Sequence, residues 1–193
     1  MADRMNGPSE ISVLGICGSL RAASYNMAAL RAAIELQPPE MTITIADIRA
    51  FPLYNEDVRA QGFPSPVETF RRQIKEANAL LFATPEYNYS MSGVLKNAID
   101  WASRPPDQPF AGKPVAIIGA GAGMAGTARA QYDLRRSCVF LDMHPVNKPE
   151  VLIGQASTKF DAEGRLTDEA GRGFIRDLLV ALERWTRLIG CNN

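Results

Sequence analysis

The sequence is poor in the residues that build metal centres and disulfide frameworks. Among 193 residues it has one histidine, His144, and three cysteines, Cys17, Cys138 and Cys191. A single histidine excludes a His-rich metal site, and nothing in the sequence pairs it with a nucleophile for a catalytic triad. The cysteines are far apart, odd in number and without CxxC spacing, so neither a zinc site nor a disulfide framework is predicted. We expect reduced thiols and a cytoplasmic protein.

The sequence also lacks an excess of charge and long apolar runs. Lys and Arg together number 21, as do Asp and Glu, so the formal net charge is zero. Nucleic-acid binding needs an excess of cations, so no such partner is expected. No run reaches the roughly 18 apolar residues of a transmembrane helix, and residues 1–10 lack the apolar core of a signal peptide. We expect no membrane partner, a short disordered lead over 1–10 and a single domain over 11–190.

Strand-like and helix-like segments alternate along the chain. The apolar or β-branched runs predict strands at 11–17, 41–46, 80–84 and 115–119, and a broken fifth strand at 143–146 and 151–153. The segments between and after them predict helices at 26–36, 67–77, 91–103, 127–141 and 167–189. The last helix is expected to present one apolar face, made of Phe174, Leu178, Leu182, Trp185 and Ile189.

This alternation predicts an α/β fold, with parallel strands joined by right-handed crossovers and helices on both faces of the sheet. Ligands of such sheets bind beyond the carboxyl ends of the strands. The loops to search are therefore those after the first, third and fourth predicted strands, at 18–26, 85–92 and 119–126.

The first of these loops reads GSLRAASYN over residues 18–26. Hydroxyls, an amide and the Arg21 guanidinium stand immediately before a helix, whose free N–H groups favour phosphate. An ordinary helix cap uses the same residue types and stays open as the simpler explanation. The loop does not match the Walker A or GxGxxG spacing. Arg21 also follows Cys17 too closely to close the phosphate loop of a cysteine phosphatase.

The third loop contains a GxGxxG match, GAGMAG, at residues 121–126. In dinucleotide-binding folds this pattern follows the first strand, and an acidic residue near the end of the next strand holds a ribose. Here it follows the fourth strand, and no acidic residue is suitably placed. We interpret it as a thin glycine wall that lets backbone amides approach a ligand. A Rossmann-type dehydrogenase, which would bind nicotinamide and no flavin, stays open as an alternative.

The second loop carries the most distinctive residues. An aromatic ring beside an amide and a carboxylate, in PEYNYS at 85–90, suits a flat, polar heterocycle. GSLRAASYN and PEYNYSMSGVLKNAIDWASRP together resemble the NAD(P)H-dependent FMN reductase family, which includes flavoprotein quinone, chromate and azo-dye reductases. The resemblance extends over nearly the whole chain, from about residue 11 to about residue 189.

The resemblance implies a flavodoxin-like three-layer α/β/α fold, with a five-stranded parallel sheet in the order 2-1-3-4-5. It implies bound FMN, with hydride passing from NAD(P)H through the flavin to flavin, quinone or similar small acceptors. No side chain is implied as catalytic, because flavin N5 does the chemistry. Many family members carry a serine in the third loop, where this chain offers only backbone donors. The implied FMN contacts are Ser19, Leu20, Arg21, Ser24, Tyr25 and Asn26 in the first loop, Pro85, Glu86, Tyr87 and Asn88 in the second, and Gly119, Ala120 and Gly121 in the third.

The resemblance also implies a homodimer or homotetramer in which a neighbour helps to close the flavin site. Trp101, Arg129 and Tyr132 are candidate interface residues, and partial burial within one subunit explains them equally well. Two other functions stay open: a non-enzymatic flavodoxin-type electron carrier and a scaffold domain without cofactor. Such carriers are usually strongly acidic, so the neutral charge favours the enzyme.

Overall fold

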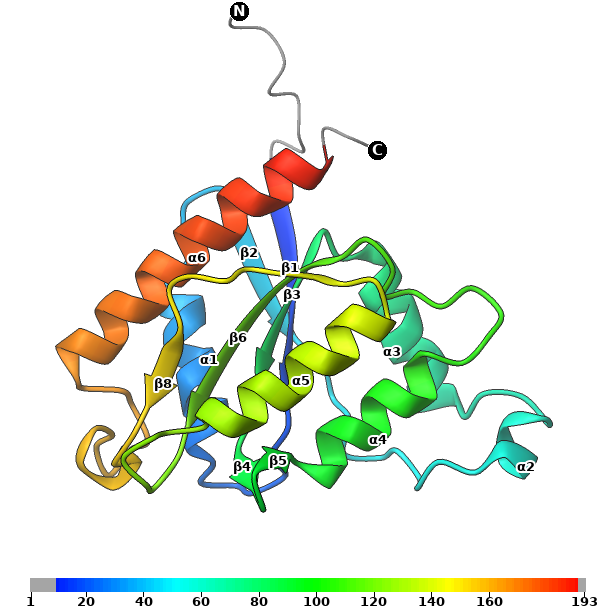
Figure 1. The fold of residues 1–193 in the computed structure, drawn as a ribbon, viewed down its shortest axis with the longest axis horizontal. Coiled ribbons are helices and arrows are strands. Elements are labelled where there is room, and N and C mark those ends of the chain that lie inside the picture. The colour runs from blue at the N-terminus through cyan, green and yellow to red at the C-terminus, as the bar shows by residue number, and fades with distance from the viewer. Residues whose placement is uncertain (1–9, 191–193) are drawn as a thin grey trace, which may run out of the picture.

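The computed structural model describes residues 10–190, so almost all of the predicted disordered lead over 1–10 lies outside the described residues. The strands are β1 (Ile11–Cys17), β2 (Met41–Ile45), β3 (Ala79–Ala83), β4 (Glu86–Tyr87), β5 (Ser90–Met91), β6 (Pro114–Ala120), β7 (His144–Pro145) and β8 (Val151–Ile153). The helices are α1 (Tyr25–Leu36), α2 (Glu56–Arg59), α3 (Ser65–Glu76), α4 (Gly93–Ala102), α5 (Ala128–Phe140) and α6 (Glu169–Gly190), with one 3₁₀ turn at Ala156–Thr158 (Figure 1).

The main sheet is parallel and follows the predicted order. Its path is β2-β1-β3-β6-β7, and β8 also pairs with β6. The predicted fourth strand is β6, and the predicted broken fifth strand is the pair β7 and β8. β7 lies beside the first residues of β6 and β8 beside the last ones. The flavodoxin-like α/β architecture expected from the sequence is therefore confirmed.

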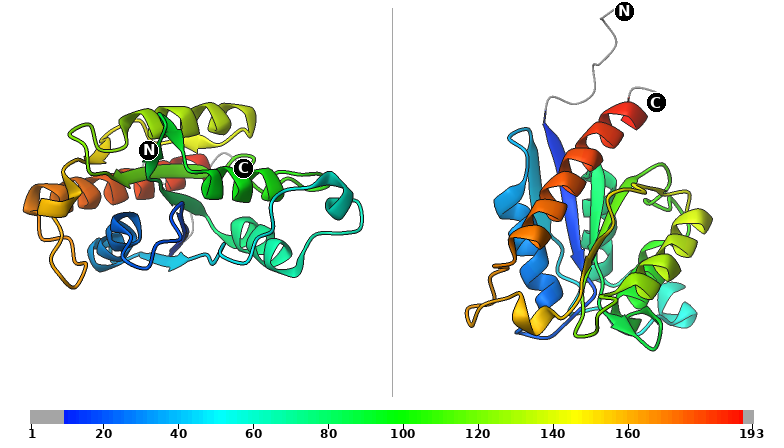
Figure 2. Two further views of the ribbon diagram at one scale, coloured as in Figure 1. Left: turned by 90° about the horizontal axis from the view of Figure 1, so that it is seen from below. Right: turned by 60° about the vertical axis from the view of Figure 1, so that its left-hand side comes forward.

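The central strands are buried on both faces, as parallel strands between two helical layers must be. In β1, Ile11, Val13 and Cys17 pack into one core cluster with α1 and α6, whereas Leu14 and Ile16 pack into the other with α3, α4 and α5. This alternation is the two-residue period of a strand. In the view from below in Figure 2, toward the end where the strands finish, α1 and α5 lie on opposite sides of the sheet.

Two local features differ from the sequence expectation. The predicted loop after the second strand contains the short helix α2, which Asn55 caps by accepting a hydrogen bond from Asp57 N. Phe174, expected on the buried face of the last helix, is 53% exposed, because the buried stripe of α6 follows Ile175, Leu178 and Leu182 instead.

Among the described residues, no helix is both long enough and apolar enough to cross a membrane.

The helix α4 holds the loop that follows β2. Asn97 Nδ2 and Trp101 Nε1 both donate to the carbonyl of Pro52, and Asn97 Oδ1 accepts from Tyr54 N. Trp101 is fully buried, with its ring edge-on to Tyr54 at 5.0 Å. The expectation that Trp101 contributes to an interface is therefore wrong, because the indole fills the space between α4 and this loop.

The close approach of β6 to α5 depends on Gly119. A Cβ built there would lie 1.8 Å from Thr127 Oγ1 and 2.8 Å from the carbonyl oxygen of Thr84. We expect Gly119→Ala to lower the free energy of unfolding by about 1–3 kcal/mol, the usual cost of overpacking. Thermal unfolding followed by circular dichroism measures this as a lower Tm.

Gly173→Ala is the matched control, because Gly173 lies inside α6 and a Cβ there meets no atom within 4 Å. Alanine is the better helix former by up to about 1 kcal/mol, so this variant is expected to be as stable as the parent or more stable. Equal effects of the two substitutions would contradict the packing argument.

Candidate functional site

Three loops meet at the carboxyl end of the central strands. The loop after β1 is joined to β3 where Gly18 N donates to Ala83 O at 2.8 Å, and the chain after β3 is joined to β6 where Thr84 N donates to Ile118 O at 3.1 Å. The loops after β1, β3 and β6 therefore start side by side, as the predicted strand order requires. The structure brings together the three segments that the sequence indicated.

Ser92 fastens the second of these segments to the first. Its hydroxyl caps α4 by accepting from Leu95 N at 3.1 Å, and it donates to Gly18 O at 2.6 Å. Ser92 is buried, so both bonds form away from water. One side chain thus fixes the start of α4 against the turn that follows β1.

Asn26 fastens the first loop to the third. Its Nδ2 donates to Ala120 O at 3.0 Å, and its Oδ1 accepts from Ala120 N at 2.9 Å. Asn26 is buried, so its carboxamide is committed to one peptide group in the protein interior. The structure assigns this side chain a bridging role that the sequence did not indicate. Direct contact of Asn26 with a phosphate stays a prediction.

The backbone donors expected in the third loop are not free where the sequence placed them. Ala120 N donates to Asn26, and Gly121 N donates to Ile153 O at 2.9 Å. The expectation that these two N–H groups serve a ligand is therefore wrong. Contact of Gly119, Ala120 and Gly121 with a cofactor through other atoms stays a prediction.

Glu86 fastens the second loop to the start of α5. Its Oε2 accepts from Arg129 N at 2.9 Å and from Ala130 N at 3.1 Å, and its Oε1 pairs with Arg129 Nη1 at 3.1 Å. The formal cap residue of α5, Thr127, makes no side-chain cap bond. Its hydroxyl instead accepts from Gln131. The first turn of α5 is therefore capped by a carboxylate 43 residues earlier in the chain.

The first turn of α1 has the opposite character. Ser24 caps it by accepting from Met27 N at 3.2 Å, and the turn contains no acidic residue. Within residues 10–190, no acceptor faces the N–H groups of Tyr25 and Asn26. Free donors and the positive end of a helix dipole attract an anion. An anionic group therefore fits at α1, whereas at α5 the Glu86 carboxylate already holds that position.

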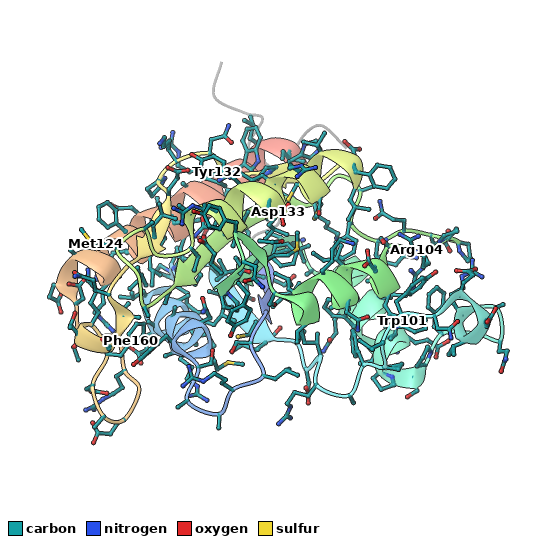
Figure 3. The ribbon with its side chains drawn as sticks, turned by 60° about the horizontal axis from the view of Figure 1, so that its bottom comes forward. Trp101, Arg104, Met124, Tyr132, Asp133 and Phe160 are labelled. Carbon is teal, nitrogen blue, oxygen red and sulfur yellow. The ribbon has the colours of Figure 1, made fainter. Side chains whose placement is uncertain are left out.

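The side chains of the first loop vary in exposure. Leu20 and Arg21 are exposed, Ser19 and Tyr25 are half-buried, and Ser24 is buried. The ring of Tyr25 packs against Phe160, which Figure 3 shows close to α1, with ring centroids 5.0 Å apart. Ser19, Leu20 and Arg21 also line an open cavity of about 420 Å³.

The other wall of this cavity was missed from the sequence. It is formed by residues 45–49, at and just after the end of β2. The same rule that selected the other three loops, the carboxyl end of a parallel strand, would have found it. Arg49 pairs with Asp47 at 2.6 Å, and its hydrogen bonds lower the pKa of Asp47 to about 2. Asp47 is therefore ionised and paired at neutral pH. Among the described residues, the cations that line this cavity without an ion pair are Arg21 and Arg31.

The thiol at the end of β1 is not a nucleophile of this site. Cys17 is buried, and burial raises the pKa of its thiol. Only a thiolate attacks an electrophile, and burial disfavours the thiolate. This agrees with the sequence-based rejection of a cysteine phosphatase.

The second loop is a hairpin with an uncommon backbone. Tyr87 pairs with Ser90, and the turn residues Asn88 and Tyr89 have φ angles of 51° and 68°. Asparagine tolerates this left-handed region, whereas a bulky tyrosine adopts it at a cost. The Arg129 guanidinium stacks on the Tyr89 ring, with its Cζ 4.1 Å from the ring centroid, and so helps to hold the turn. Tyr87 and Asn88 are exposed, Glu86 is half-buried and Pro85 is buried.

Comparison with known proteins identifies relatives over nearly the whole chain. The family model described as NADPH-dependent FMN reductase matches residues 11–158. An NAD(P)H-dependent FMN reductase of Pseudomonas aeruginosa is 66% identical over 178 residues, which is 92% of this chain and 96% of that protein. An NAD(P)H:quinone oxidoreductase of Solanum tuberosum is 49% identical and covers 90% and 91% of the two chains.

A solved structure matches both the sequence and the fold. The flavoenzyme NAD(P)H:(acceptor) oxidoreductase of Paracoccus denitrificans superposes with a TM-score of 0.83 at 33% identity. The match covers 92% of this chain and 98% of that one. The loops described above therefore lie on a scaffold that is shared with a flavoenzyme.

Asn26→Asp tests the bridge between the first and third loops. Aspartate has the same shape, but one of its oxygens would face the Ala120 carbonyl without a hydrogen to share. We expect the free energy of unfolding to fall by about 2 kcal/mol or more, because a buried charged group and a buried carbonyl both lose their partner. Urea unfolding measures the loss.

Asn147→Asp is the matched control. Asn147 is exposed, and its Oδ1 only accepts from Arg135 at 3.3 Å, a bond that a carboxylate preserves. This variant should unfold at the same urea concentration as the parent. A loss of similar size at both positions would count against the bridge.

Proposed function

This chain belongs to the NADPH-dependent FMN reductase family, and we propose that its first, second and third loops hold the FMN. It is an NAD(P)H-driven flavin oxidoreductase. FMN held there would supply the chemistry, hydride transfer from NAD(P)H to an acceptor. The observation that carries the placement of FMN is the pair of free N–H groups at the start of α1, with Arg21 unpaired in the loop before them.

Each loop then has a separate task. Arg21, Ser19, Ser24 and the backbone around Leu20 and Tyr25 bind the phosphate, since charge-assisted hydrogen bonds to an anion are the strong ones. The hairpin residues Pro85 to Asn88 and the backbone at 119–121 border the ring and the ribityl chain. Ser92, Asn26 and Glu86 hold the three loops together, so the binding geometry is set before the cofactor arrives.

Two rival functions are disfavoured by specific features. A dinucleotide fingerprint places a pyrophosphate at the start of the following helix. In α5, that position is filled by the Glu86 carboxylate, which would repel a phosphate. A non-enzymatic flavodoxin-type carrier is set aside by membership of an enzyme family.

The acceptors, the assembly and the location belong to the same proposal. We assign flavins, quinones and similar small molecules as acceptors, as the names of the relatives suggest. The chain acts as one domain over 11–190 and works in the cytoplasm, where thiols such as the unpaired Cys17 and Cys138 stay reduced. It needs neither a membrane nor a nucleic acid as partner.

The outer side of α5 is our choice for the interface of a homodimer or homotetramer. Tyr132, labelled in Figure 3, is 59% exposed. Val139 and Phe140, about two turns further along the same helix, are 83% and 85% exposed. Arg129 lies on the same helix and is also exposed. Large apolar side chains exposed together mark an interaction surface.

The visible spectrum and one substitution test the cofactor assignment. The purified protein is expected to be yellow or to take up added FMN, and Arg21→Ala should weaken FMN binding about tenfold or more, because a charge-assisted phosphate contact is lost. Fluorescence quenching of FMN gives the Kd. Arg72→Ala, at an exposed position on α3, is the control and should bind as the parent does. A colourless protein that ignores FMN would end the assignment.

The interface is tested with a pair of identical substitutions. Phe140→Glu on α5 should dissociate the oligomer, because a carboxylate would have to be desolvated in the contact. Phe174→Glu changes an exposed phenylalanine on α6 and should leave the assembly intact. Light scattering at micromolar protein concentration measures the mass. A monomeric parent protein, or dissociation by both variants, would refute the α5 interface.

A further inference from the structure

The ion pair between Glu86 and Arg129 lies where two of the three loops meet. Arg129 presents both its backbone N–H and its guanidinium to the Glu86 carboxylate, and the same guanidinium stacks on Tyr89. The Glu86 side chain is 14% exposed and that of Arg129 is 48% exposed. The pair therefore has one charge held inside the protein and one partly open to water.

The surroundings show that the carboxylate is not needed merely to close the hairpin. The β4–β5 hairpin is formed by its own backbone pairs, Glu86 with Met91 and Tyr87 with Ser90. What the carboxylate adds is the cap of α5, which that helix lacks locally. It also adds a fixed negative charge between Pro85 and Tyr87, two residues that we assign to the flavin.

We infer that Glu86 and Arg129 are positioning residues whose opposite charges tune the reduction potential of the bound flavin. This inference rests on the proposed placement of FMN. Glu86 is itself one of the residues assigned to the flavin, and charges closer together than a Debye length, about 8–10 Å at physiological salt, are only partly screened from one another. Reduction adds negative charge to a flavin, so a nearby carboxylate opposes it and a nearby guanidinium favours it.

The two charges make predictions of opposite sign. Glu86→Gln keeps an oxygen that can accept from the first turn of α5 but removes the negative charge, so bound FMN should become easier to reduce. Arg129→Met keeps the backbone N–H and much of the side-chain length but removes the positive charge, so bound FMN should become harder to reduce. A purely structural role would disturb the same hairpin in both variants and give no such opposition.

The experiment is a redox titration of the holoprotein followed by flavin absorbance, for the parent and both variants. We expect the ratio of the Kd of oxidised FMN to that of reduced FMN to rise about threefold to tenfold in E86Q and to fall by a similar factor in R129M. A tenfold change corresponds to about 30 mV for a two-electron couple. The double variant E86Q/R129M should return close to the parent potential.

Matched controls and separate readouts keep the outcomes distinct. Glu68→Gln removes an acid from the first turn of another helix, α3, and Arg72→Met removes an exposed cation from the same helix; both should leave the potential unchanged. Shifts of the same sign in E86Q and R129M, or no shift in either, would overturn the inference. If E86Q does not fold, the direction of the R129M shift still decides. Failure of the parent protein to bind FMN would instead refute the proposed function.

Discussion

The buried bond pair between Asn26 and the Ala120 peptide group is the constraint on which the arrangement of the site depends. Loops at the end of a parallel sheet are free to move unless something ties them to one another. A buried carboxamide that meets one N–H and one C=O is satisfied in a single geometry, and any displacement leaves several polar groups unpaired in the interior. Ser92 and Glu86 act in the same way at the other two junctions, so the site is shaped by the cost of burying unpaired polar atoms.

Whether the N–H groups at the start of a helix already have an acceptor within the protein then decides which ligand the site accepts. The starts of α1 and α5 both follow strands of the sheet, and each follows a loop whose sequence suggests anion binding. Of these two helices, only α1 leaves donors of its first turn free, the N–H groups of Tyr25 and Asn26, because α5 receives the Glu86 carboxylate. One phosphate position is therefore open and the other is filled from within. This suits a mononucleotide with one terminal phosphate better than a pyrophosphate laid across the third loop.

The sequence predicted the architecture well because each part of it depends on local patterns. Apolar runs and their spacing indicate the strands, and the β-α alternation indicates their parallel pairing, whereas the strand order is what the family resemblance implies. The errors arise where distant residues decide. Trp101 is as compatible with an interface as with the core, until Pro52 and Tyr54 are seen to enclose it. Phe174 fits a helical stripe with Leu178 and Leu182, yet α6 buries Ile175 in its place. The N–H groups of Ala120 and Gly121 look free in the sequence because their acceptors, Asn26 and Ile153, lie far away along the chain.

The motif that carried the family resemblance contains two kinds of residue, and only the structure separates them. In PEYNYSMSGVLKNAIDW, Asn97 and Trp101 form hydrogen bonds with the loop after β2, and Ser92 forms one with the turn after β1. By contrast, the side chains of Tyr87 and Asn88 make no hydrogen bond to another described residue, and both residues are exposed. Residues of this motif whose side chains are buried and hydrogen-bonded within the protein hold its loops in place, so we assign the free and exposed members of the motif to the cofactor. Glu86 belongs to both groups, since its carboxylate is bound within the protein while its charge still acts on whatever lies against the hairpin.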